Sequence, residues 1–248
     1  MISKNKVVIV MPAYNAEKTL VKTFNDIPKK YRKDVVLVDD GSWDKTIKVA
    51  KKLGIKSFIH PQNRGYGGNQ KTCYTLALSE GAQVVVMIHP DYQYDSTLTE
   101  EIVKPILDGR FDIMLGSRIR TRKEVLEGGM PSYKYYSNRF LTMLENIILG
   151  QNLSEYHTGF RAFNRKVLEE LPFHKFSDDF VFDQDMLISA AKENFRMGEI
   201  QVPVRYFPEA SSINFQRSVK YGLGILWGLT RYIVEPIGII HFKIFNKK

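Results

Sequence analysis

Short apolar runs alternate with longer amphipathic stretches along the first half of the chain. Most of the runs are rich in β-branched residues, as expected for strands of a parallel sheet that helices cover on both faces. The stretches between them have the spacing of amphipathic helices. The predicted strands are Val7–Met11, Asp34–Val38, Lys56–Ile59, Val84–Ile88 and Asp112–Leu115, and the predicted helices are Ala16–Ile27, Thr46–Leu53, Asn69–Glu80 and Ser96–Leu107.

This βαβα order predicts an α/β fold with right-handed crossovers and a doubly wound, mostly parallel sheet. The second half is more irregular, and it predicts helices around Tyr135–Ile148 and Gln184–Asn194 before an extended segment that ends at Phe207. A length of 248 residues suits one large α/β domain with a short appendage. We place the domain at residues 1–210 and a helical tail at residues 211–248.

Polar clusters follow four of the predicted strands. Ligands of open α/β sheets bind beyond the carboxyl ends of the strands, so we expect these four neighbouring strand ends to converge on one crevice. The clusters are Pro12-Ala13-Tyr14-Asn15-Ala16-Glu17, Asp39-Asp40-Gly41-Ser42, His89-Pro90-Asp91-Tyr92-Gln93 and Gly116-Ser117-Arg118.

The first two clusters have the chemistry to hold a nucleoside. Tyr14 can flank a base, and Glu17 or the adjacent Asp39 and Asp40 can accept hydrogen bonds from its ring N–H groups. Ordinary turn and cap chemistry explains the same residue types, so both interpretations stay open. Two adjacent carboxylates directly after an apolar strand repel each other, which favours a ligand or solvent at that point.

The segment from His89 to Gln93 is the strongest local signal for chemistry. Asp91 at a strand end can hold a hard divalent cation whose other positions are taken by diphosphate oxygens and water. Such an ion neutralises charge on a leaving nucleoside diphosphate. Gln93 and His89 stand two residues to either side of Asp91, project from the same side of an extended segment, and can join or support the ion. A simple turn is the alternative interpretation of His89 beside Pro90.

Three further features add candidate residues. The stretch Arg64–Asn69, with Gly68, can cradle a phosphate at the start of a helix, or it can be a turn that lets the helix pack closely. Arg118 at a strand end suits a phosphate or a sugar hydroxyl. Asp183 and Asp185 in a later acidic run are candidate bases, but two residues so spaced cannot share one face of a helix.

The ordered segments resemble family 2 glycosyltransferases of the dolichyl-phosphate-mannose-synthase-like group. The resemblance covers roughly residues 6–210, and it rests on the order of the motifs rather than on any single one. The motifs are Pro12-Ala13-Tyr14-Asn15, Asp39-Asp40-Gly41-Ser42-Trp43-Asp44-Lys45-Thr46, Asn63-Arg64-Gly65-Tyr66-Gly67, Gly116-Ser117-Arg118 and Thr158-Gly159-Phe160-Arg161-Ala162.

The resemblance implies a GT-A-type fold, a nucleoside-diphosphate sugar as donor, a magnesium or manganese ion, and inversion at the anomeric carbon. It implies that Asp91 binds the metal with Gln93 assisting. His89 and His157 both stand where the family commonly has an aspartate, and a histidine ligand suits manganese better than magnesium. The residues that it assigns to the nucleotide sugar, with those of the clusters above, are Pro12, Ala13, Tyr14, Glu17, Asp39, Asp40, Gly68 and Arg118.

The charge balance and the tail favour an anionic partner. Lysine and arginine exceed aspartate and glutamate by 36 to 27, a net charge of +9, but no nucleic-acid-binding motif accompanies the excess, so we do not expect a nucleic-acid partner. A helix predicted over Ser218–Val234 has its longest uncharged run at Tyr221–Thr230, too short to cross a bilayer of about 30 Å. This helix can lie in an anionic membrane interface, or it can pack on the domain or on a partner chain in a homo-oligomer.

These observations lead to one hypothesis and its alternatives. Residues 1–11 contain no signal-peptide pattern and Cys73 is the single cysteine, so we expect a peripheral protein at the cytoplasmic face of the membrane. The hypothesis is an inverting, metal-dependent glycosyltransferase that acts on a polyprenyl (dolichyl-type) phosphate or another lipid-linked glycan. A soluble sugar or protein hydroxyl would need a general base, Asp183 or Asp185. A non-catalytic nucleotide-sugar-binding protein is the alternative from another class.

Overall fold

The computed structural model describes residues 5–203, 215–237 and 242–245. Within them one sheet has seven strands in the order β3-β2-β1-β4-β6-β5-β7. Neighbouring strands are parallel except at β6, which runs antiparallel to both β4 and β5. The strands are β1 (Val7–Ala13), β2 (Val35–Asp39), β3 (Lys56–Ile59), β4 (Val84–Met87), β5 (Ile113–Ser117), β6 (Arg161–Asn164) and β7 (Met197–Gln201).

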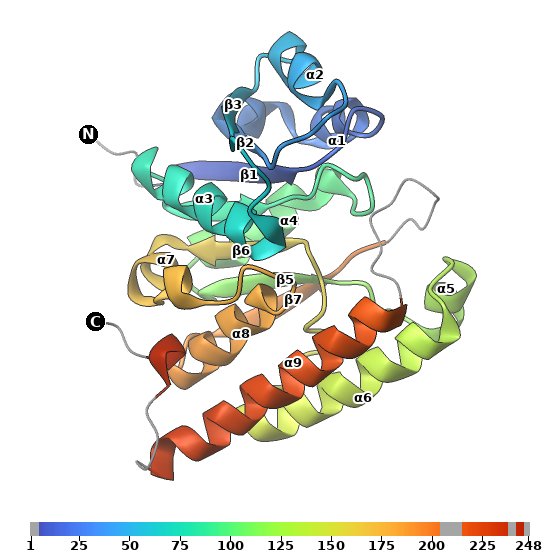
Figure 1. Ribbon diagram of the computed structural model, residues 1–248, viewed down its shortest axis with the longest axis vertical. Helices are drawn as coiled ribbons and strands as arrows, with labels where there is room; N and C mark the ends of the chain where they lie inside the picture. Colours follow the sequence, from blue (N-terminus) through green and yellow to red (C-terminus); the bar gives the residue numbers. More distant parts are fainter. Residues whose placement is uncertain (1–4, 204–214, 238–241, 246–248) are drawn as a thin grey trace.

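Helices cover both faces of this sheet (Figure 1). Alternate side chains of β1 enter two separate cores: Val8 and Val10 pack with residues of α3, α7 and α8, whereas Ile9 and Met11 pack with residues of α1 and α4. The predicted α/β fold with a mostly parallel sheet is therefore confirmed. The helices are α1 (Leu20–Asp26), α2 (Thr46–Lys52), α3 (Gly65–Ser79), α4 (Thr99–Leu107), α5 (Arg122–Glu127), α6 (Ser132–Leu149), α7 (Arg165–Glu170), α8 (Phe182–Lys192) and α9 (Phe215–Val234).

The predicted elements are present, and most of their ends shift by a few residues. The starts of two helices shift most: α1 begins at Leu20 instead of Ala16, and α3 begins at Gly65 instead of Asn69. The predicted extended segment forms β7 as far as Gln201, and its last residues, 204–207, lie outside the described residues.

Strand β6 separates two of the strand ends that the sequence pattern placed side by side. Met87 of β4 and Leu115 of β5 both pair with Arg161, the first residue of β6. Because β6 is antiparallel, it starts at the edge of the sheet where β4 and β5 end. The expectation of four neighbouring strand ends was therefore wrong at this point, and the start of β6 joins the crevice instead.

Helices α6 and α9 form an outer layer beside α8, and Figure 1 shows α9 running along α6. Two glycines allow α9 to approach α8 closely. A Cβ atom on Gly224 would lie 2.5 Å from Val181 Cγ2, and one on Gly228 would lie 2.7 Å from Ile188 Cδ1. None of the helices in the described part of the chain has the length and hydropathy of a membrane span.

The packing of α9 on α8 is tested by a pair of glycine substitutions. Gly224→Ala is expected to lower the free energy of unfolding by about 1–3 kcal/mol, because the new methyl group overlaps Val181. Gly222→Ala is the control, since its Cβ would have Leu141 Cδ1 as nearest neighbour at 3.9 Å. That variant should be unchanged or more stable by about 0.5–1 kcal/mol. Equal losses in urea unfolding would contradict the close contact.

Candidate active site

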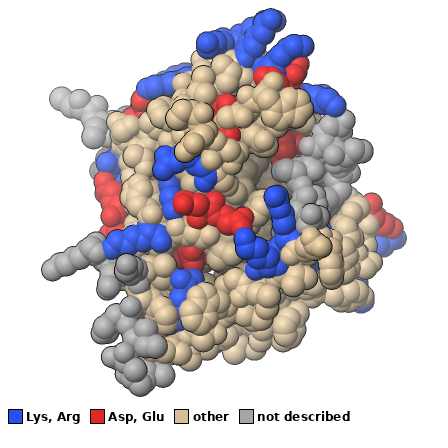
Figure 2. Space-filling view, in the orientation of Figure 1, with Lys and Arg blue, Asp and Glu red and all other residues tan. Residues whose placement is uncertain are grey.

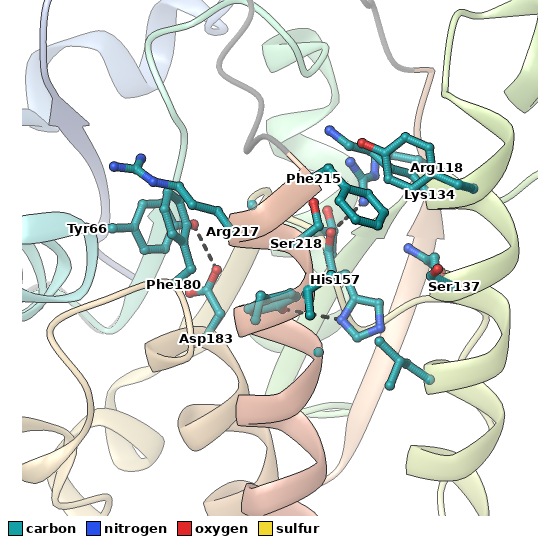
Figure 3. Close-up of a pocket in the computed structure, with 18 of the residues that line it drawn as sticks. Tyr66, Arg118, Lys134, Ser137, His157, Phe180, Asp183, Phe215, Arg217 and Ser218 are labelled. Carbon is teal, nitrogen blue, oxygen red and sulfur yellow. Dashed lines mark hydrogen bonds between the residues drawn. The ribbon is translucent and has the colours of Figure 1, made fainter.

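A cleft of about 780 Å³ lies at the edge of the sheet where β4 and β5 end. Its volume is in the range of small-molecule sites. In Figure 3, Tyr66, Phe180 and Asp183 gather at one end of this cleft, and Arg118, Lys134 and Ser137 lie at the other. Among the predicted site residues, those that line it are Tyr14, His89, Asp91, Gln93, Arg118 and Asp183, and those that do not are Pro12, Ala13, Glu17, Asp39, Asp40, Gly68 and Asp185.

Asp183, in the first turn of α8, is held by three side chains from other elements. Its carboxylate accepts hydrogen bonds from Tyr66 Oη at 2.8 Å and from Gln70 Nε2 at 3.0 Å, and it lies 3.4 Å from Arg161 Nη1. Burial and the charge of Asp183 raise the pKa of the Tyr66 phenol well above its ordinary value, so Tyr66 remains a hydrogen-bond donor. Asp183 therefore faces the cleft in a fixed orientation.

His89 packs against Tyr66 at the end of β4. The two ring planes are 5° apart with their centroids at 5.4 Å, and His89 Nε2 lies 3.3 Å from Tyr66 Oη. Gly159 provides the space, because a Cβ atom there would be 2.8 Å from His89 Cδ2. Burial lowers the pKa of His89, which leaves the imidazole neutral, the form that binds metal ions.

The residues at the end of β4 fit a metal ion that is shared with a diphosphate. Among the described residues, no three His, Cys, Asp or Glu side chains lie close enough to hold an ion by themselves. Asp91 lies in the cleft and its Oδ1 accepts the N–H of Gln93 at 3.0 Å. A single protein carboxylate is compatible with Mg²⁺, which usually keeps several waters or phosphate oxygens as ligands. His89 would join only if its Nε2 exchanged the Tyr66 hydroxyl for the ion.

Asp39 and Asp40 are buried and bonded to the protein itself. The carboxylate of Asp39 accepts the N–H of Ser42 at 3.0 Å. The carboxylate of Asp40 accepts the N–H groups of Arg64 at 2.9 Å and Gly65 at 3.1 Å. Donors of the protein itself therefore offset the repulsion between these adjacent carboxylates, without a ligand or solvent.

The segment from Pro12 to Glu17 forms a turn of which only Tyr14 reaches the cleft. Pro12 and Ala13 are the last residues of β1, where the carbonyl of Ala13 accepts the N–H of Asp40 at 2.8 Å. Glu17 Oε2 accepts the N–H of Lys45 at 3.1 Å. Tyr14 is 54% exposed, so its ring is available for stacking.

The glycine-rich start of α3 packs closely against the segment that carries Ser177 and Asp178. Gly67 and Gly68 donate their N–H groups to the carbonyl of Asp178, at 2.8 and 3.4 Å. A Cβ atom on Gly67 would lie 2.4 Å from the carbonyl oxygen of Ser177. These contacts favour the packing interpretation of this stretch, because the N–H groups of Gly67 and Gly68 already have an acceptor.

Asp185 points away from the cleft, into the contact between α8 and α9. Its carboxylate accepts the N–H of Ser177 at 3.0 Å and pairs with Arg231 Nη2 at 2.8 Å. The expectation that Asp183 and Asp185 do not share a face is confirmed. Of the two candidate bases, Asp183 is the one in the cleft.

The opposite end of the cleft is cationic. Arg118 Nε lies 2.9 Å from Oε1 of the buried Glu155, and Arg118 Nη2 donates to the carbonyl of His157 at 2.5 Å. Glu155 therefore balances much of the Arg118 charge. Burial and the Arg118 charge lower the pKa of Lys134, and the exposed Arg217 of α9 adds a third cation.

Four of the residues that shape this site were not predicted: Tyr66, Lys134, Glu155 and Arg217. The sequence signal for Tyr66 was an aromatic residue inside a glycine-rich stretch. Lys134 and Arg217 each lie in the first turn of a long helix, which was a second usable signal. Glu155 had no local signal, because its partner Arg118 lies 37 residues away along the chain.

A second buried polar pair lies beside Arg118. His157 lines the cleft, and its Nε2 lies 3.3 Å from Oε2 of Glu145 on α6. Burial raises the pKa of Glu145 well above its ordinary value. Burial, with the charges of Arg118 and Arg161, lowers the pKa of His157 to about 3. His157 is therefore uncharged near neutral pH, and burial favours the protonated form of Glu145.

Known proteins resemble this chain in sequence over most of its length. Residues 8–172 match the family described as Glycosyl transferase family 2. An uncharacterized protein of Methanocaldococcus jannaschii is 30% identical over 228 residues, 92% of each chain. A UDP-N-acetylglucosamine–dolichyl-phosphate N-acetylglucosaminyltransferase of Methanococcus voltae is 27% identical over 215 residues, 80% of this chain and 85% of that protein.

The same fold occurs in a solved structure. Glucosyl-3-phosphoglycerate synthase of Mycobacterium tuberculosis, in complex with Mn²⁺, UDP-glucose and phosphoglyceric acid, superposes with a TM-score of 0.71 at 18% identity. The alignment covers 96% of this chain and 82% of that chain. Because the identity is low, this likeness bears on the fold alone, and it confirms the GT-A-type architecture.

The raised pKa of Glu145 predicts a pH-dependent effect of Glu145→Gln. A carboxyl group whose pKa is higher in the folded protein than its ordinary 4.5 stabilises the fold least at high pH, because unfolding then releases its proton. Glutamine does not titrate. The stability of the variant relative to wild type should therefore rise by roughly 1 kcal/mol per pH unit above pH 4.5, up to the folded pKa.

Urea unfolding of both proteins at pH 5, 6 and 7 measures this difference. The lowered pKa of His157 affects both proteins and largely cancels when they are compared. A stability difference that does not change with pH would show that the buried Glu145 is ionised with an ordinary pKa.

Proposed function

The chain belongs to glycosyl transferase family 2, and from that premise we propose that it transfers a sugar, with inversion, to a polyprenyl phosphate. Membership makes it a nucleotide-sugar glycosyltransferase, and the acceptor and the stereochemistry are what we propose. One observation carries the proposal. The cleft runs without interruption from Asp91 and Asp183 to an apolar groove between α6 and α9.

The donor is assigned to the end of the cleft near β1 and β4. The exposed ring of Tyr14 can stack on a nucleobase. Asp91, with Gln93 assisting, would hold Mg²⁺ or Mn²⁺, which when bound neutralises charge on the leaving diphosphate. UDP-sugars are the first donors to test, because the Methanococcus voltae relative is named for one.

The other end of the cleft has the chemistry of an anionic lipid head followed by a hydrocarbon chain. Lys134, Arg217 and Arg118 supply positive charge, and Ser137 and Ser218 supply hydroxyl groups. Because Arg118 lies at this end, we assign it to the acceptor instead of the nucleotide sugar. Cations and hydroxyls of this kind bind phosphate oxygens. Beyond them the groove is lined by apolar residues of both helices, which are Phe140, Leu141, Phe215, Val219, Leu223 and Leu226.

A phosphate acceptor fits the site because its reaction does not depend on a general base. One acceptor oxygen forms a bond to the anomeric carbon as the bond from that carbon to the diphosphate oxygen breaks, which inverts the configuration in one displacement. A phosphate monoester is largely ionised near pH 7, so this step needs no strong base. Asp183, which already accepts two hydrogen bonds beside Arg161, then orients groups in the cleft.

A hydroxyl acceptor is the second candidate, and the position of Asp183 in the cleft is the observation in its favour. In that case the Asp183 carboxylate would take the hydroxyl proton as the new bond forms. The two acceptor classes differ in pH dependence, since only the hydroxyl requires an ionised base.

Exposed apolar rows on α6 and α9 border the same groove. Their members recur every three or four residues as far as Trp227, and Ile233 follows six residues later, so each row covers one side of its helix. Figure 2 shows few charged side chains over the lower part of the molecule, where these helices lie. We assign this surface to the membrane interface, from which a lipid acceptor reaches the groove. The rows are Tyr133, Tyr136, Phe140, Met143 and Ile147 on α6, and Phe215, Val219, Leu223, Trp227 and Ile233 on α9.

Asp91→Asn tests the metal assignment. Replacing the carboxylate with an amide should lower kcat/KM about 100-fold or more, because charge on the leaving diphosphate loses its support. The control is Asp95→Asn: Asp95 accepts the N–H of Thr97 at the start of a short helical turn, and asparagine caps such turns as well.

Product formation is measured with UDP-sugars, polyprenyl phosphate and each metal, and folding with the melting temperature. Transfer by Asp91→Asn at the wild-type rate would exclude the metal assignment. Donor binding by wild type without transfer to any acceptor would favour a non-catalytic nucleotide-sugar-binding protein.

The membrane assignment is tested with Ile147→Glu combined with Trp227→Glu. Two charges in place of exposed apolar side chains should weaken binding to phosphatidylglycerol vesicles at least about tenfold. Ile59→Glu on β3 is the control, because Ile59 is similarly exposed (49%) but lies outside this surface. Unchanged vesicle sedimentation, with loss of a dimer in size-exclusion chromatography, would assign the surface to a second copy of the chain.

A further inference from the structure

Glu145 is a buried acid that the proposed chemistry does not use. Its side chain is 0% exposed, on the inner side of α6. Within the described residues, neither of its carboxyl oxygens has a hydrogen bond of regular geometry. A buried polar group without a hydrogen-bond partner destabilises the fold, so its presence calls for an explanation. The polar atom that faces it is His157 Nε2, at 3.3 Å.

The imidazole of His157 bridges the two walls of the acceptor groove (Figure 3). On one side it meets Glu145 of α6. On the other side its Nδ1 lies 2.9 Å from Gln184 Nε2 on α8 and 3.3 Å from Tyr221 Oη on α9. The ring is therefore held between the helices that any acceptor in the groove would contact.

The backbone of the same segment holds the cation at the acceptor end. The carbonyl of His157 accepts a hydrogen bond from Arg118 Nη2 at 2.5 Å. The carbonyls on either side, of Tyr156 and Thr158, accept hydrogen bonds from Arg161. The His157 ring and the carbonyl that accepts from Arg118 therefore belong to one residue, which also has neighbours bonded to Arg161.

The protonation states of Glu145 and His157 determine which of the two groups donates in their contact. Burial favours the protonated form of Glu145 and leaves His157 neutral, so the Glu145 carboxyl can direct a proton at His157 Nε2, 3.3 Å away, while Nδ1–H faces the Gln184 amide. The amide oxygen and nitrogen of Gln184 can exchange places to suit this tautomer. One tautomer and one ring orientation then suit the groups on both sides of the ring, although the contact of Nε2 with Glu145 lacks the geometry of a regular hydrogen bond.

We propose that Glu145 is a positioning residue which, through His157, fixes the Arg118 guanidinium for the anionic group of the acceptor. The proposal rests on the proposed function, in that Arg118 is assigned to the acceptor phosphate. Loss of the carboxyl group then weakens use of the acceptor and leaves use of the donor unchanged, because Asp91 and Tyr14 lie at the other end of the cleft.

Three variants of the full chain test this role with farnesyl phosphate as acceptor. Glu145→Met keeps the length and removes the polar group, and it should raise the KM for farnesyl phosphate about tenfold. Glu145→Gln keeps a hydrogen-bonding group and should stay within about threefold of wild type. Leu149→Ala, one turn further along α6 and buried, is the matched control: it should lower the melting temperature without changing this KM. The donor KM should be unchanged in all three.

A signal that needs no turnover gives a second readout. The ¹⁵N–¹H resonance of Arg118 Nε, assigned with Arg118→Lys, should shift in Glu145→Met and stay in place in Leu149→Ala. An unmoved resonance, or equal KM values for Glu145→Met and Leu149→Ala, would overturn the positioning role. If wild type neither binds nor uses a prenyl phosphate, the proposed acceptor fails, and the Arg118 resonance still decides the role of Glu145.

Discussion

The buried guanidinium of Arg161 is the constraint on which the cleft depends. Its side chain is 1% exposed, so its N–H groups need acceptors inside the protein. Nη1 donates to the carbonyl of Asp183 at 3.0 Å, Nη2 donates to the carbonyl of Tyr156 at 3.0 Å, and Nε donates to that of Thr158. These bonds join the start of α8 and the turn before β6 to the first residue of β6. Losing one partner would leave a buried charge uncompensated.

The same residue separates the charges of the cleft. Burial acts to lower the pKa of Arg161, but the charge of Asp183 and the nearby phenols raise it overall, so the guanidinium remains charged. Asp183 is thereby held at the end near Tyr66, while Glu155 holds Arg118 at the other end. The carboxylate of Asp183 therefore lies at one end of the cleft and the guanidinium of Arg118 at the other. This separation favours an acceptor that is negatively charged.

Local pattern was enough to predict most of the fold, because strands that are buried on both faces are continuous apolar runs. β6 was missed because Arg161–Asn164 is short and polar at both ends, and its strand geometry depends on pairing with β4 and β5. The same limit applied to the site: local pattern could indicate residues at strand ends but not contacts between distant residues. Asp91, predicted from its place after a strand, lines the cleft. The bonds from Arg64 to Asp40 and from Arg118 to Glu155 join residues 24 and 37 positions apart, and no local pattern reports them.

The position of α9 restricts how a bulky ligand can enter the cleft. One side of this helix is fixed to α8 by the close approach at Gly224 and by the buried pair of Arg231 with Asp185. The other side exposes Leu223 and Trp227. A helix that is held so closely on one side cannot move back to admit a bulky chain, since the core behind it is close-packed. For the lipid-phosphate acceptor that we propose, this leaves entry along the line between α6 and α9, with the hydrocarbon part on the apolar rows and the phosphate leading toward the cationic end of the cleft.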